Sequence, residues 1–131
     1  MSFDLRNETG ESFRFSNSGW GFYLNLGEEY GWQPAGTHPP EGIDASAWPK
    51  TYDSNDGQWI SAEDAERLAG ALQRALDDPA RVERASVIAK ARTAAVRAAT
   101  GSDYEVRVEG DDTPFLRDMI GFFQKGRFQI W

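Results

Sequence analysis

The alternation of apolar and polar positions predicts three strands along the chain. In "ESFRFS", Phe13 and Phe15 alternate with polar neighbours, which is the two-residue period of a half-buried strand. "SDYEVRVEG" repeats the pattern with Tyr104, Val106 and Val108, and "RFQIW" repeats it at the end of the sequence. We therefore expect strands of an antiparallel sheet at residues 12–16, 103–109 and 127–131.

Helical periodicity dominates the remaining segments. In "SAEDAERLAGALQRAL", apolar residues recur at spacings of three and four and form one stripe that includes Leu68 and Leu72. Ser61 is a good N-terminal cap for this helix, and Asp64 follows three residues later, at the position of the acidic partner in a capping box. Similar patterns predict four helices, at residues 18–30, 61–77, 79–100 and 114–125.

Together these elements predict a single α+β domain over residues 1–131, with about four helices packed on a small antiparallel sheet. A chain of 131 residues buries roughly two-thirds of the surface that its unfolded form exposes, and 40% of its residues are hydrophobic. A packed core is therefore expected. Its centre should contain five side chains: Leu68, Leu72, Phe123, Phe128 and Ile130.

The stretch "YDSNDGQWI" concentrates Asp, Asn and Gly, so it raises the question of a metal-binding loop. A calcium-binding EF-hand loop that began at Asp53 would need a ligand where Gly57 stands and a bidentate glutamate where Asp64 stands. The calcium interpretation therefore fails, and a tight turn that precedes a helix is predicted instead. Short strands at Thr51–Asp53 and Gln58–Ile60 are expected to flank the turn.

The residue inventory restricts the chemistry of any site. The chain has no cysteine, which excludes thiolate catalysis and cysteine-based zinc sites, and His38 is its one histidine. The sequence contains no phosphate-binding loop and no nucleophile motif. We expect no cofactor and no metal, and an enzyme is the less favoured class. Asp53 and Asp56 leave a small carboxylate-dependent hydrolase open as an alternative.

Charge is distributed unevenly along the chain. The net charge is −7, and residues 1–78 carry 14 acidic against 5 basic side chains, whereas residues 79–100 carry 1 against 5. An acidic body repels nucleic-acid phosphates and attracts a cationic protein, although acidity can also serve solubility alone. We expect no nucleic acid as a partner. Because the sequence shows neither a membrane-spanning run nor a signal-peptide pattern, we expect no membrane contact and a cytoplasmic location.

Three motifs resemble those of a family of small uncharacterised bacterial α+β proteins. They are "GWQPAGT" (31–37), "SNDGQWISAEDA" (54–65) and "FFQKGRFQIW" (122–131), and residues 79–112 are particular to this sequence. The resemblance implies no established activity. By analogy of class alone, small acidic α+β proteins of this type resemble immunity proteins, which neutralise toxins by direct contact.

The favoured hypothesis is an acidic protein-binding module, immunity- or antitoxin-like, that neutralises a cationic partner by direct contact. Aromatic anchors surrounded by steering charge are typical of such interfaces. A structural or self-associating domain remains the alternative, and the oligomeric state stays open. The expected partner-binding residues are Glu28, Glu29, Trp32, Trp48, Asp53, Asn55 and Asp56, with the two tryptophans as exposed anchors.

Overall fold

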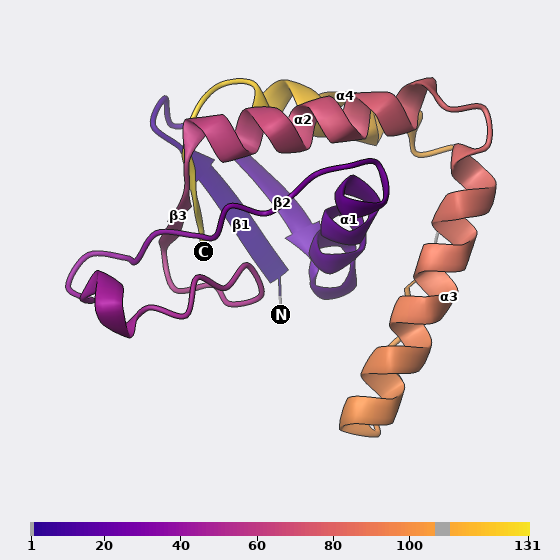
Figure 1. Ribbon diagram of the computed structural model, residues 1–131, viewed down its shortest axis with the longest axis horizontal. Coiled ribbons are helices and arrows are strands. Elements are labelled where there is room, and N and C mark those ends of the chain that lie inside the picture. The colour runs from indigo at the N-terminus through magenta and orange to yellow at the C-terminus, as the bar shows by residue number, and fades with distance from the viewer. Residues whose placement is uncertain (1, 107–110) are drawn as a thin grey trace.

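The computed structural model describes residues 2–106 and 111–131, and these residues form an α+β fold of four α-helices and one four-stranded sheet (Figure 1). The α+β prediction is therefore confirmed. In chain order the elements are β1 (Ser2–Asn7), β2 (Ser12–Ser16), α1 (Asn17–Glu29), the 3-10 turn η1 (Ala45–Ala47), β3 (Gln58–Ile60), α2 (Ala62–Asp77), α3 (Arg81–Thr100), α4 (Thr113–Phe123) and β4 (Phe128–Ile130).

The sheet is antiparallel throughout and has the order β2-β1-β4-β3. β1 and β2 form a hairpin in which Phe3 lies opposite Phe15. β4 lies inside the sheet, because Ile130 is the register partner of Leu5 on one side and of Gln58 on the other. Sequence analysis missed β1, although Phe3 and Leu5 alternate with polar neighbours in the same way as the strands that it found.

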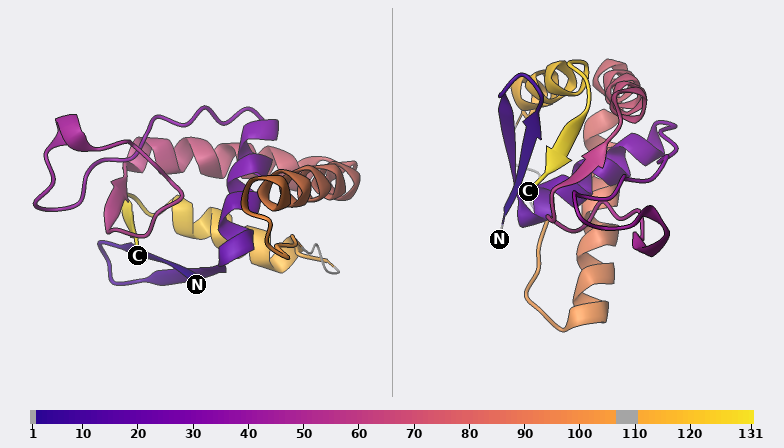
Figure 2. Two further views of the ribbon diagram at one scale, coloured as in Figure 1. Left: turned by 90° about the horizontal axis from the view of Figure 1, so that it is seen from below. Right: turned by 90° about the vertical axis from the view of Figure 1, so that its left-hand side faces the viewer.

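The five side chains predicted for the core centre are all buried, with at most 1% of their surface exposed. α2 and α4 lie side by side over the sheet (Figures 1 and 2). The predicted cap of α2 is also present, because the Ser61 hydroxyl accepts a hydrogen bond from the Asp64 amide at 3.1 Å. Within the described ranges, the helices are too short or too polar to cross a membrane.

α3 leaves the end of α2 at a steep angle and extends away from the sheet, which leaves much of its surface uncovered (Figures 1 and 2). Its first turn is fixed to the body of the protein by buried Arg81, which forms an ion pair with Asp112 and donates a hydrogen bond to Thr113 at 3.0 Å. The Tyr23 hydroxyl donates to the same Asp112 carboxylate at 2.8 Å. This network sets the position of α3 relative to α1 and α4.

Two strand predictions were wrong. Thr51–Asp53 forms no strand, and neither do residues 103–106, whereas residues 107–109 lie outside the described part of the chain. The segment at 103–106 packs against α3 instead of joining the sheet. The Val106 amide donates to the Thr93 hydroxyl at 3.0 Å, and Arg92 donates to the Tyr104 hydroxyl at 3.0 Å.

Candidate functional site

Three adjoining hollows follow the junction of α1 and α3, and Arg92 lines all of them. The first, here called the outer groove, has a volume of about 490 Å³ and is lined by Asn25, Glu28, Glu29, Ile88, Ala91, Arg92, Ala95 and Val96. The middle hollow measures about 140 Å³ and is lined by Gly21, Leu24, Asn25, Glu28, Trp32, Pro34, Tyr52, Asp53 and Arg92. The third, here called the inner cavity, measures about 590 Å³ and is lined by Phe3, Trp20, Gly21, Asp53, Arg92, Val96, Thr100, Ser102 and Tyr104.

The α3 side of the outer groove is apolar apart from Arg92. Ile88, Ala91 and Ala95 recur at spacings of three and four, so one face of the helix presents them together. Ala91 and Ala95 are exposed in this structure. Because their side chains are single methyl groups, the backbone of another segment can approach this face closely.

The α1 side of the outer groove is acidic. Glu28 and Glu29 occupy the last turn of α1, which contains no basic residue, so their charges add to the negative end of the helix dipole. Glu29 pairs with Arg84 at 3.3 Å, and from the described residues Glu28 accepts one hydrogen bond, a long one of 3.4 Å from Asn25. Their position thus costs α1 stability and places negative charge along the groove.

Arg92 crosses from α3 to α1 at the centre of the junction. Its Nη1 donates to the Asn25 side-chain oxygen at 2.9 Å, and its Nε donates to the Tyr104 hydroxyl. The guanidinium lies directly against Gly21, where a Cβ atom would come within 2.0 Å of Nη2. A glycine inside a helix costs stability relative to alanine, and the close approach of Arg92 gives Gly21 a packing reason.

The structure brings together only part of the predicted site. Glu28 and Glu29 share the outer groove, and Glu28 and Asp53 share the middle hollow with one edge of Trp32. Asn55 and Asp56 are exposed on the loop that carries Asp53 but line none of the three hollows. Trp48 lies away from this region, beside η1.

The expectation that Trp32 and Trp48 are exposed anchors was wrong. Only 4% of Trp32 and 8% of Trp48 are exposed. Each indole N–H has a hydrogen-bond acceptor inside the protein, which is Asp64 for Trp32 and the Thr37 hydroxyl for Trp48, both at 3.0 Å. The long segment from 31 to 50 uses these rings to attach itself to the body, so they stabilise the fold and offer little area to a partner.

Asp64 is the centre of that attachment. Its carboxylate is buried and accepts hydrogen bonds from Trp32, from the Ala35 amide at 3.3 Å and from the Tyr52 hydroxyl at 2.6 Å. Burial and the neighbouring Asp64 carboxylate raise the pKa of Tyr52, so its hydroxyl remains a proton donor over the ordinary pH range. Sequence analysis assigned Asp64 to the cap of α2 alone.

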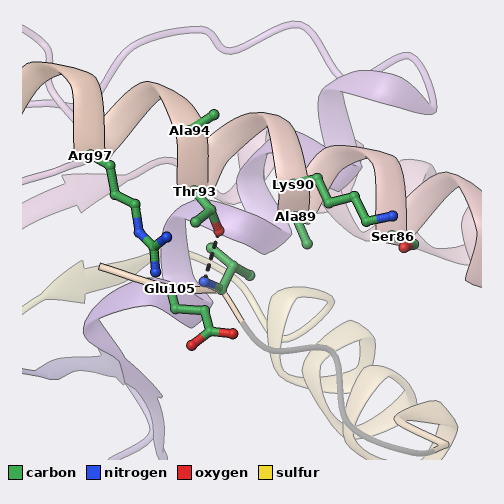
Figure 3. A pocket seen from close by; sticks show the side chains of 8 residues that line it. Ser86, Ala89, Lys90, Thr93, Ala94, Arg97 and Glu105 are labelled. Carbon is green, nitrogen blue, oxygen red and sulfur yellow. Dashed lines mark hydrogen bonds between the residues drawn. The ribbon is translucent and has the colours of Figure 1, made fainter. Parts of the chain in front are cut away.

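A basic pocket of about 420 Å³ lies on the opposite face of α3, and its lining includes Ser86, Lys90, Thr93, Arg97 and Glu105 (Figure 3). Arg97 extends from the helix toward the segment that follows it and donates to the Tyr104 carbonyl at 2.7 Å. α3 therefore separates an acidic groove from a basic pocket, as the charge pattern of residues 79–100 indicates.

The three sequence motifs also meet in space, but for structural reasons. The first joins the second through Asp64, and the second joins the third where Gly57 lies against Trp131 and donates to the Ile130 carbonyl at 2.8 Å. No protein-family model matches the chain, and no curated protein or solved structure matches it. The family resemblance thus stays a prediction. Among the described residues, no cluster of three or more acidic or histidine side chains could hold a metal ion.

Proposed function

We propose that this protein is an acidic binding module that holds a cationic, amphipathic segment of another protein in the outer groove. One observation carries the proposal: an acidic surface and an apolar surface run beside each other along the groove. The first is the pair of carboxylates on Glu28 and Glu29, and the second is the apolar face formed by Ile88, Ala91 and Ala95.

The groove defines the chemistry of the segment that fits it. Lysine or arginine side chains on one edge would pair with Glu28 and Glu29, and small apolar side chains on the other would cover Ala91 and Ala95. An amphipathic helix presents both edges at once, with anchors three and four residues apart. Charge would then accelerate encounter, and apolar burial would hold the complex once formed.

Such a site is suited to neutralisation of a partner by direct contact, as in immunity or antitoxin proteins. It requires a complementary surface and no catalytic group. The basic side of α3, with Lys90 and Arg97, also complements the acidic groove, so a second copy of this chain is the competing occupant. Capture of a basic protein would favour the partner, whereas a dimer with no other protein captured would favour the second copy.

The test is affinity capture from cells that express the protein, followed by kinetics on each protein recovered. The groove variant is Glu28→Gln/Glu29→Gln. Its matched control is Glu41→Gln/Glu66→Gln, which removes the same charge from two exposed positions outside the hollows described above. A basic protein that is captured by wild type and by the control, but not by the groove variant, supports the proposal.

A second pair of variants tests the apolar face. Ala95→Arg places a bulky cation in the outer groove, whereas Ala62→Arg places the same group at an exposed position of α2 outside the hollows. Loss of the partner with Ala95→Arg alone is the expected result. Equal binding by all four variants would overturn the proposal, as would recovery of no protein other than this chain together with a dimer in analytical ultracentrifugation.

A further inference from the structure

The inner cavity offers a second kind of binding chemistry. It lies between α3 and the start of β1 and is lined by side chains from β1, α1, α3 and two connecting segments. Its volume of about 590 Å³ falls within the range of roughly 300–1,000 Å³ that is typical of small-molecule sites.

The Arg92 guanidinium enters this cavity as a cation without a carboxylate. Its two hydrogen bonds go to the neutral oxygens of Asn25 and Tyr104, and no acidic side chain in the described ranges forms an ion pair with it. Two of its five N–H groups are thus occupied, and the contact with Gly21 holds the planar group in place. A guanidinium held in this way is suited to a planar carboxylate.

Asp53 supplies the opposite charge at the same cavity. It is exposed, and within the described part of the chain no donor bonds its carboxylate. Asp53 and Arg92 line both the middle hollow and the inner cavity, yet they form no ion pair with each other. A cation and an anion thus border the same cavity without pairing with each other.

The remaining walls are largely apolar. Phe3 and Trp20 line the cavity as buried aromatic residues, and Val96 contributes a half-buried side chain of α3. Trp20 is fixed because its indole N–H donates to the Tyr52 carbonyl at 2.8 Å. A ligand for this cavity therefore needs one carboxylate, one cationic group and an apolar body.

We propose that the inner cavity binds a free α-amino acid with an apolar side chain. Arg92 receives the carboxylate of the amino acid, Asp53 receives its ammonium group, and its side chain lies against Phe3, Trp20 and Val96. This site is separate from the proposed protein-binding function, because it does not use Glu28, Glu29 or the alanines of the outer groove.

The experiment measures binding of three probes by isothermal titration calorimetry. L-leucine carries both charges, N-acetyl-L-leucine lacks the ammonium group, and L-leucinamide lacks the carboxylate. Wild type should bind L-leucine about tenfold or more tightly than either analogue, because each analogue loses a charge-assisted hydrogen bond.

Two substitutions assign the ends of the ligand. Asp53→Asn should abolish the preference for L-leucine over N-acetyl-L-leucine, and Arg92→Gln should abolish the preference over L-leucinamide. The matched controls are Asp56→Asn on the same loop and Arg97→Gln on the opposite face of α3, and both should retain wild-type preferences.

The proposal is wrong if wild type binds none of the probes at millimolar concentration. It is also wrong if Asp53→Asn prefers L-leucine over N-acetyl-L-leucine as strongly as wild type does. Because Asp53 is exposed, its variant folds even if Arg92→Gln does not. The Glu28→Gln/Glu29→Gln variant should bind L-leucine normally. The amino-acid proposal can therefore be tested even if the protein-binding proposal fails.

Discussion

The buried carboxylate of Asp64 accepts a hydrogen bond from the Trp32 indole at 3.0 Å and thereby joins the start of α2 to a residue that precedes it by 32 positions. Tyr52 and the Ala35 amide donate to the same carboxylate. One acidic side chain therefore anchors two parts of the segment between α1 and β3.

Replacement of Asp64 by alanine should lower the free energy of unfolding by about 3 kcal/mol or more, because buried donors on Trp32 and Tyr52 would lose their acceptor. Urea denaturation measures the change. The control is Glu66→Ala, two residues along α2 and exposed, where a change within about 0.5 kcal/mol is expected. Similar values for the two variants would contradict the role of Asp64.

Gly21→Ala should destabilise the protein despite the better helix propensity of alanine. The added Cβ would meet the Arg92 guanidinium at 2.0 Å, so the bonds from Arg92 to Asn25 and Tyr104 would be displaced. Gly121→Ala in α4 is the control, because its Cβ meets no atom within 4 Å. The free energy of unfolding of Gly121→Ala should rise by up to about 1 kcal/mol. Thermal denaturation shows whether each variant is more or less stable than wild type. A stabilised Gly21→Ala would show that Arg92 moves freely.

Tyr30 should make stability depend on pH in the alkaline range. Burial, followed by the hydrogen bond that its hydroxyl donates to Asp78 at 2.5 Å, raises the pKa of Tyr30 to about 12 from its usual value of 10.0. Its stabilising contribution is complete below pH 10 and is lost as the pH rises through about 12.

Asp78→Asn should move this titration toward lower pH, because it removes the negative charge beside the phenol. Ultraviolet absorbance measures phenolate formation, and subtraction of the Tyr30→Phe titration isolates this residue from the other tyrosines. An unchanged Tyr30 titration in Asp78→Asn would exclude the electrostatic cause.

Salt should slow the association of the proposed partner more than it speeds dissociation, since exposed charges are screened beyond about 8 Å at physiological ionic strength. Stopped-flow kinetics at a series of sodium chloride concentrations measures both rates. The Glu28→Gln/Glu29→Gln variant should show a shallower dependence of its association rate, whereas Ala95→Arg should also raise the dissociation rate. If the association rate does not depend on salt concentration, electrostatic steering is not part of the proposed mechanism.

Periodicity was sufficient to predict most elements because the apolar stripes of helices such as α2 and α4 face the core. In α2, Leu68 and Leu72 lie where the pattern requires. The same argument failed for the segment containing Tyr104 and Val106. These residues alternate with polar ones because the segment packs on α3 and has a covered side and an open side. Alternation alone does not show whether a neighbouring strand exists.

The site was harder to predict than the fold. Composition places Glu28, Glu29 and Asp53 in an acidic part of the sequence, but it does not distinguish a buried tryptophan from an exposed one. The burial of Trp32 depends on a partner in α2 that no local pattern identifies. Arg92 was overlooked because its contact with Gly21 joins two helices that are distant in the sequence.

The interior position of β4 has a consequence for the kinetics of folding. β4 supplies the pairing between β1 and β3, yet the four helices lie between the β1–β2 hairpin and β4 in the chain. Until β4 docks, the hairpin has an open edge, and Gln58–Ile60 has no strand beside it. The sheet therefore closes only when distant parts of the chain meet, and contacts of such high sequence separation slow folding.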